Sequence, residues 1–204
     1  MSPKAATSPT KGVAPQRRGP GSRADDNHPT RVELLDAAVA LAEREGLHAL
    51  SVAGITTAAG HAKGTFYIHF SDRAAFLVAM HRWFHDRVFT QIVEQTSADA
   101  PGPERVGKRL LAFLDACLTL PGVRALLLEA RTEPAISAEV DSRNRQATTV
   151  LAADLTGVCA HPDETARLLV LGAADIAARE SVRHRRISAA RQALLDLVPA
   201  RVES

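Results

Sequence analysis

Apolar residues recur at steps of three and four through almost the whole chain after Thr30. That spacing puts them on one face of an α-helix, whereas a half-buried strand would need apolar residues at every second position. No stretch of the sequence shows the alternation of a strand. Hydrophobic residues make up 46% of the chain and aromatic residues only 4%, which favours helices packed through aliphatic side chains. We therefore predict an all-α protein.

Glycine, proline and capping residues divide this pattern into separate helices. Gly46 and Gly60 stand where a helix would end, and Thr30 and Ser51 stand where a side chain would cap the start of one. The Pro101-Gly102-Pro103 stretch is the clearest loop in the middle of the chain. The pattern predicts helices over residues 30–45, 51–59, 63–69, 71–95, 106–118, 123–130, 136–158, 162–182 and 188–198.

Residues 1–29 have a different composition from the rest of the chain. They are rich in proline, glycine and serine, carry several basic side chains, and offer almost nothing to bury. Such a segment cannot offset the entropy lost on folding, so we predict a disordered basic arm. Two roles stay open for it: a solubilising tail or an arm that contacts DNA. The net charge of the whole chain, +2, does not decide between them.

The segment from Ser51 to Arg73 carries the most specific functional signal. Two short expected helices, residues 51–59 and 63–69, are joined by a tight turn that contains Gly60. This order is that of a helix-turn-helix, in which the second helix enters the major groove of DNA while the first braces it. Four side chains can form the small core between the two helices: Ile55, Ala59, Phe66 and Phe70.

The residues around this turn resemble the signature of the TetR/AcrR family of transcriptional regulators. The matching residues are Ala59-Gly60, Lys63-Gly64-Thr65-Phe66-Tyr67, His69-Phe70 and Asp72-Arg73, within a similarity that covers roughly residues 30 to 80. The resemblance implies an N-terminal three-helix helix-turn-helix domain followed by a larger helical ligand-binding and dimerisation domain. It also implies a homodimeric repressor that reads a palindromic operator and releases the DNA when a small-molecule inducer binds. The resulting prediction is a disordered basic arm over 1–29, a DNA-binding domain over 30–75 and a ligand-binding and dimerisation domain over 76–204.

The residue types in the helix-turn-helix suit contact with double-stranded DNA. Hydroxyl, ammonium and imidazole groups can donate to phosphates, Lys63 and Thr65 can also reach base edges, and Gly64 leaves room for close approach. The candidate DNA-binding residues are Ser51, Thr56, Lys63, Gly64, Thr65, Tyr67, His69 and Arg73. Three residues depart from the family pattern: His61 replaces a valine, Ala62 replaces a capping serine, and Thr56 replaces a small residue. We therefore expect the second helix to start without a side-chain cap.

A ligand pocket would combine apolar walls with isolated polar groups on otherwise buried helix faces. Trp83, Phe84, Phe113 and Cys117 are the candidate wall residues, and Glu129, Arg143 and Asp175, together with Asn144, are the candidate polar contacts. For dimerisation, the expected helix over 162–182 carries small residues that allow another helix to approach closely: Gly172, Ala173, Ala174, Ala177 and Ala178. The same residues would serve a contact within one chain equally well.

A metal site is a weaker alternative for the second domain. His81 and His85, and likewise Glu180 and His184, are four residues apart and could each present two ligands on one helix face. This spacing is common, so we predict neither a metal nor any other cofactor.

The sequence offers no catalytic motif and no signal for export. It has no phosphate-binding glycine loop, no GxSxG and no HExxH, and Cys117 and Cys159 have no CxxC partner. Its start lacks the apolar core of a signal peptide, and no apolar run is long enough to span a membrane. We predict a cytoplasmic protein that is not an enzyme. The alternative to a DNA-binding regulator is a helical module that binds another protein.

Overall fold

The computed structural model describes residues 28–46, 49–119, 124, 128 and 134–200. Every regular element longer than one turn in these ranges is an α-helix, so the predicted all-α class is confirmed. The helices are α1 (Pro29–Glu45), α2 (Val52–Ala58), α3 (Lys63–His69), α4 (Arg73–Gln95), α5 (Pro103–Thr119), α7 (Pro134–Leu155), α8 (Pro162–Arg183) and α9 (Ser188–Asp196). Residues 1–27 of the arm predicted over 1–29, and most of the helix predicted over 123–130, lie outside the described residues. The end of that predicted arm is corrected, because Pro29 already begins α1.

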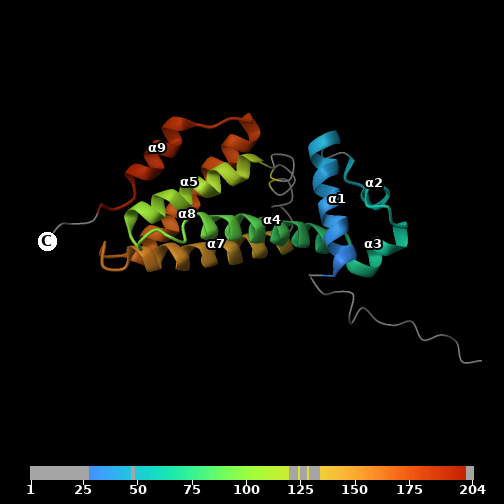
Figure 1. The fold of residues 1–204 in the computed structure, drawn as a ribbon, viewed down its shortest axis with the longest axis horizontal. Coiled ribbons are helices and arrows are strands. Elements are labelled where there is room, and N and C mark those ends of the chain that lie inside the picture. The colour runs from blue at the N-terminus through green and yellow to red at the C-terminus, as the bar shows by residue number, and fades with distance from the viewer. Residues whose placement is uncertain (1–27, 47–48, 120–123, 125–127, 129–133, 201–204) are drawn as a thin grey trace, which may run out of the picture.

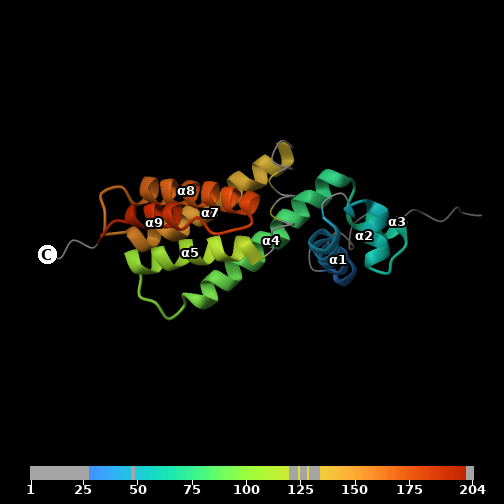
Figure 2. The same cartoon turned by 90° about the horizontal axis from the view of Figure 1, so that it is seen from above.

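The helices form two groups that are joined by the long helix α4. Helices α1, α2 and α3 gather at one end of the molecule, and α4 runs from them into a bundle with α5, α7 and α8 (Figure 1). The view from above shows α9 lying beside α8 on the side of the bundle away from the small group (Figure 2). Helix α4 contacts α1 at one end and α5 and α7 further along, so it physically connects the two groups.

Capping side chains explain where three of the helices begin. The Ser51 hydroxyl accepts a hydrogen bond from the Gly54 amide at 3.0 Å, and the Asp72 carboxylate accepts one from the Ala75 amide at 2.8 Å. The bond from Ala75 also holds the pKa of Asp72 below its ordinary value. Thr30 is not the cap of α1. Pro29 takes the first helical position, where its missing N–H needs no partner. The helix therefore starts one residue before Thr30, and His28 is its cap.

An aromatic cluster holds the small helical group to the start of α4. The ring centroids of Phe66, Phe70 and Phe76 lie between 5.0 and 5.4 Å apart, and all three side chains are buried. Two of these residues belong to α3 and its end, and the third lies on the first turn of α4. Helix α3 therefore cannot tilt relative to α4 without disturbing three packed rings.

Buried ion pairs hold the larger bundle together. The Asp154 carboxylate of α7 accepts from Arg105 and from Arg109 of α5, the latter at 2.6 Å. The Glu180 carboxylate of α8 accepts from Arg191 of α9 at 2.7 Å. Both carboxylates are almost wholly buried, and each joins two helices. No helix in the described ranges is long and apolar enough to cross a membrane.

Candidate DNA-binding surface and ligand cavity

Helix α3 has one buried face and one exposed face. Phe66 is buried, whereas Lys63, Gly64 and Tyr67 are exposed, with 54% of Tyr67 accessible. Because an α-helix repeats every 3.6 residues, positions 63, 64, 67 and 68 share the outward side. An ammonium group, a phenol and a glycine with no side chain are thus presented together to the solvent.

The turn before α3 contains His61 and Ala62, the two residues from which we expected a helix start without a side-chain cap. Gly60 adopts a φ of 71°, a left-handed conformation that costs glycine little. Ala62 occupies the N-cap position without a side-chain hydrogen bond, as predicted. The His61 side chain reaches Glu33 of α1, with 2.8 Å between Nε2 and Oε2. His61 therefore fixes the turn through a polar contact with α1.

Two of the residues expected to contact DNA point into the domain. Thr56 is 2% exposed, and its hydroxyl donates to the Val52 carbonyl oxygen one turn earlier at 2.8 Å. His69 is 7% exposed, and its ring lies 4.8 Å from that of His28. Their helix faces pack against the rest of the domain. The expectation that these two side chains contact phosphates is therefore wrong. Thr57, the neighbour of Thr56, is exposed.

The other candidates lie at the surface of the helix-turn-helix. Ser51 and Arg73 are exposed, and Thr65 is half-buried at the start of α3. The Ser51 hydroxyl is already an acceptor for the Gly54 amide, which leaves its own proton for another partner. Gly64 has open space where a Cβ atom would stand, so nothing within the chain requires a glycine there.

Sequence reasoning missed two residues of this domain. Arg31 of α1 donates to the His69 carbonyl oxygen at 2.8 Å and stacks over the Phe70 ring, so it anchors the end of α3. Ile68 is 42% exposed on the outward face of α3. The helical repeat could have identified Ile68 as a neighbour of Gly64, but no sequence signal indicates the long-range role of Arg31.

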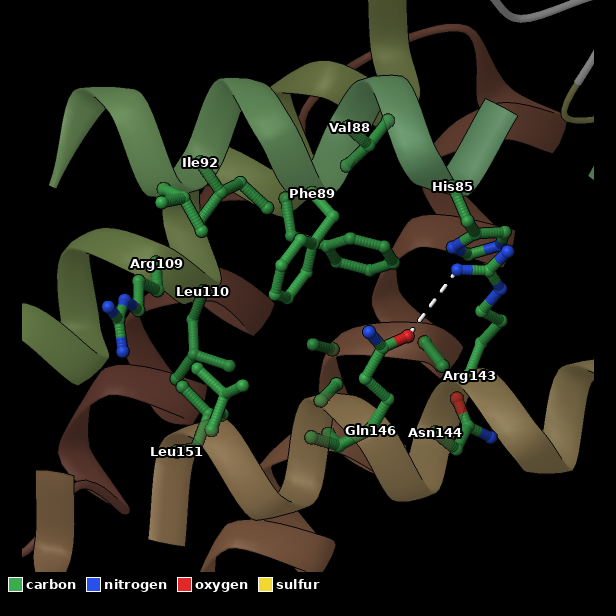
Figure 3. A pocket seen from close by; sticks show the side chains of 17 residues that line it. His85, Val88, Phe89, Ile92, Arg109, Leu110, Arg143, Asn144, Gln146 and Leu151 are labelled. Atoms are coloured by element: carbon green, nitrogen blue, oxygen red, sulfur yellow. Dashed lines mark hydrogen bonds between the residues drawn. The ribbon is translucent and has the colours of Figure 1, made fainter. Parts of the chain in front are cut away.

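A cavity lies between α4, α5, α7 and α8 of the larger bundle (Figure 3). Counted out to the solvent it has about 820 Å³ of empty space, of which about 110 Å³ can take the centre of a water molecule. Most of its lining is apolar: Val88, Phe89, Ile92, Val93, Leu110, Phe113, Ala147, Val150, Leu151, Val170, Ala173 and Ala174. A space of this size with apolar walls suits a small organic molecule.

Polar side chains lie at the two ends of the cavity. Arg109 stands at one end, where it pairs with Asp154, and His85, Arg143 and Asn144 stand together at the other (Figure 3). Arg143 is held by carboxylates on both sides, at 2.6 Å from Asp86 of α4 and at 3.0 Å from Glu139 of α7. It also donates to Gln146 at 3.4 Å.

Only part of the predicted ligand site lines this cavity. Phe113, Arg143 and Asn144 do so, and Glu129 lies outside the described residues. Phe84 and Cys117 are fully buried in the core and do not border the space. Each lies on a helix face that is turned from the cavity toward the neighbouring helices. Burial raises the pKa of the Cys117 thiol to about 11, which keeps it protonated and unreactive.

Two further expectations for the ligand site are wrong. Trp83 packs against the guanidinium of Arg87 at 4.8 Å instead of facing the cavity. Asp175 is exposed and pairs with Arg179 one turn along α8. Asp175 follows Ala174, which does line the cavity, and one residue of helix turns the side chain by about 100°.

The metal alternative finds no support among the residues that the structure describes. His81 and His85 stack at 4.2 Å on α4, but the Glu180 oxygens are taken by Arg191 and by the Ile187 amide. His184 is exposed and ends α8 in a left-handed conformation. No group of three His, Cys, Asp or Glu side chains in the described ranges is placed to hold an ion.

Sequence reasoning missed most of the apolar lining. Val88 and Ile92 lie at helical spacing from the buried Phe84, but this spacing does not reveal which turns of α4 face empty space and which face another helix. Phe89 lies beside Val88 and fills the middle of the cavity (Figure 3). Its exposure to the cavity depends on the distance between α4, α5 and α7.

Comparison with known proteins supports the assignment of the N-terminal domain. Residues 34–80 match the family model described as bacterial regulatory proteins, tetR family. An uncharacterized HTH-type transcriptional regulator of Bacillus subtilis (strain 168), YuxN, is 32% identical over 69 residues. Those residues are 33% of this chain and 24% of the relative, so the match spans about a quarter of that protein.

Solved structures match most of the chain in fold. A transcriptional regulator from Rhodococcus sp. Rha1 has a TM-score of 0.69 at 20% identity, covering 82% of this chain and 92% of that one. The multidrug binding protein EbrR, complexed with imidazole, has a TM-score of 0.65 at 21% identity, covering 86% and 98%. A putative transcriptional regulator from Saccharomonospora viridis, in complex with choline, has a TM-score of 0.63 at 22% identity, covering 82% and 94%.

Proposed function

We propose, from the premise that this chain is a TetR-family transcriptional regulator, that it is a homodimeric repressor that releases its operator when a small molecule binds. One observation carries the proposal for DNA: the outward face of α3 presents Lys63, Gly64 and Tyr67 together. The lysine and the phenol are donors for phosphates, and the glycine lets the backbone approach the groove. Ile68 on the same face offers an apolar contact for a thymine methyl group.

The dimer would form through the outer faces of α8 and α9. Leu168, Leu171 and Val182 lie at helical spacing along α8 with 67%, 45% and 75% of their surfaces exposed, and Leu197 follows α9 with 67% exposed. An apolar stripe of this length would be costly in water, and a second copy of the chain would cover it. The small residues of α8 contribute less than expected. Ala173 and Ala177 are buried inside the chain, and a Cβ at Gly172 would lie 3.0 Å from Leu194 of α9.

The proposed response to ligand runs through α4. From Phe76 in the aromatic cluster to His85 at the cavity is nine residues, or about 14 Å along one helix. A molecule that spreads the cavity would move α4, and the packed rings would carry that movement to α3. Two proteins of the same fold are known in complex with imidazole and with choline, which supports a small-molecule ligand here.

Selection of bound sequences from random double-stranded DNA tests the proposal. We expect a palindrome whose half-sites lie one helical turn apart, about 34–36 Å. Lys63→Ala and Tyr67→Ala should weaken binding at every salt concentration, and Lys63→Ala should also reduce its dependence on salt. Thr56→Val, at a buried hydroxyl, is the matched control and should leave the selected sequence unchanged. DNA binding that is absent or insensitive to salt would instead favour a protein-interaction module.

A sedimentation experiment tests the dimer separately. Leu168→Asp and Val182→Asp place charges on the apolar stripe of α8 and should convert the dimer to a monomer. Arg167→Gln, which changes an exposed neighbour on α8, should leave the dimer intact. A wild-type chain that sediments as a monomer would overturn this part of the proposal.

A further inference from the structure

A small polar recess adjoins the polar end of the cavity. Counted out to the solvent it has about 240 Å³ of empty space, of which about 10 Å³ can take the centre of a water molecule. It shares His85, Phe113, Arg143, Asn144 and Ala174 with the lining of the main cavity. The residues that belong to the recess alone are His81, Arg124 and Val140. The main cavity is therefore apolar through its middle, and a nitrogen-rich recess lies at one end.

Arg124 is the unusual residue of this recess. Its side chain is only 2% exposed, and its Nε and Nη2 atoms have no hydrogen-bond partner in the described part of the chain. A buried guanidinium without an acceptor is costly, because burial removes its water and nothing replaces it. Such a group calls for an explanation, and an acceptor that binds in the recess would supply one.

The other arginines that line the two spaces have acidic partners. Arg143 pairs with Asp86 and Glu139, and Arg109 pairs with Asp154. The buried carboxylate of Glu180 is engaged by Arg191 and by a backbone amide. Within the described residues the recess therefore carries one guanidinium charge that no carboxylate balances.

We infer that the ligand is an apolar molecule with one carboxylate, whose head group binds Arg124 in the recess and whose body fills the apolar cavity. This rests on the proposed function, since it names the ligand class of the regulator's own cavity. A planar guanidinium matches a carboxylate with two parallel hydrogen bonds, and one negative charge balances one positive charge. A cationic ligand would instead add a second uncompensated charge to the same end.

Three probes with one apolar body and different head groups test the inference on the full chain. Decanoate, decan-1-ol and decylammonium are titrated by calorimetry at neutral pH. The cavity lining on α4 runs from His85 to Val93, about 12 Å along the helix, which suits such an extended chain. We expect decanoate to bind at least about tenfold more tightly than the alcohol or the amine, as for a gained charge-assisted hydrogen bond.

Arg124→Met removes the guanidinium and keeps a long side chain. It should bring the affinity for decanoate down to that for decan-1-ol. Arg87→Met, which removes an exposed arginine from the outer side of α4, is the matched control and should keep the preference. Ligand-free Arg124→Met should also unfold at the same or a higher temperature than the unaltered chain. The substitution removes a buried guanidinium whose Nε and Nη2 atoms have no acceptor among the described residues. An arginine with only a structural role would lower that temperature.

Equal affinities for the three probes in the unaltered chain would overturn the inference, whatever the variants do. Retention of the preference in Arg124→Met would overturn it as well. Operator binding is measured in parallel to separate the two proposals. A chain that binds DNA but shows no preference for decanoate overturns the ligand class alone, and one that prefers decanoate but binds no DNA overturns the regulator alone.

Discussion

The group formed by α1, α2 and α3 and the larger bundle share one apolar core, but different further interactions add to it in each. Around α3, three phenylalanine rings form the centre of the packing, and the polar side chains of α3 face outward. In the bundle, helices are joined by the buried carboxylates of Asp154 and Glu180. Packed rings resist a change in the tilt of α3, whereas Arg109 and Arg143 of the bundle both form ion pairs and line the cavity. If the proposed ligand binds there, it can compete with the carboxylates for these two arginines.

The largest expected effect tests the aromatic packing around α3. Phe70→Ala removes a ring that is 1% exposed and contacts both Phe66 and Phe76, so the free energy of unfolding should fall by about 4 kcal/mol. Tyr67→Ala, on the outward face of α3, should change it by less than about 0.5 kcal/mol. Urea denaturation followed by circular dichroism measures both. Equal losses would mean that the exposed face also holds the domain together.

The second prediction tests the ion pairs of the bundle. Asp154→Asn leaves Arg105 and Arg109 without their shared carboxylate and should destabilise the chain by about 3 kcal/mol. Asp175→Asn breaks an exposed pair with Arg179 and should cost less than about 1 kcal/mol. Thermal unfolding distinguishes the two variants. A small loss in Asp154→Asn would show that hydrophobic packing, as around α3, also dominates the bundle.

The third prediction concerns acid. Burial alone would raise the pKa of Glu180, but Arg191 and the Ile187 amide hold that pKa below its ordinary value of 4.5. The ionised carboxylate therefore stabilises the fold at pH values above 4.5, and this contribution is lost as the pH falls below that value. Unfolding free energies measured between pH 7 and pH 3 should decline less steeply in Glu180→Gln than in the unaltered chain. Parallel curves would contradict this role.

Capping and turn preferences of neighbouring residues were enough to predict most of the group formed by α1, α2 and α3. The side-chain cap at Ser51 and the turn at Gly60 depend on neighbouring residues, and the structure places them as expected. The orientations of Thr56 and His69 were wrong, because they depend on which side of a short helix packs against α1. That choice involves residues distant in sequence, such as Arg31, and no local pattern contains it.

The cavity was less predictable for a related reason. The helical period shows which side chains of α4 turn inward, but Phe84 meets other helices while Phe89 meets empty space. Whether an inward side chain borders a cavity depends on how far apart α5 and α7 lie. The same limit applies to Arg124, because only the three-dimensional structure shows that its Nε and Nη2 atoms are buried with no acceptor among the described residues.

The smallest effect on stability comes from Gly64→Ala, which separates folding from function within α3. No atom lies within 4 Å of the position of a Cβ at Gly64, and its φ is not positive, so alanine fits the folded chain. Alanine also favours a helix, so the variant should be more stable by about 0.5 kcal/mol. Its methyl group would project toward DNA and should weaken operator binding by at least about tenfold, or ~1.4 kcal/mol. Gly54→Ala is the contrasting control, since its Cβ would lie 2.5 Å from the Ala49 carbonyl oxygen and should destabilise the domain itself. If Gly64→Ala binds the operator as tightly as the unaltered chain, α3 does not approach DNA through this face.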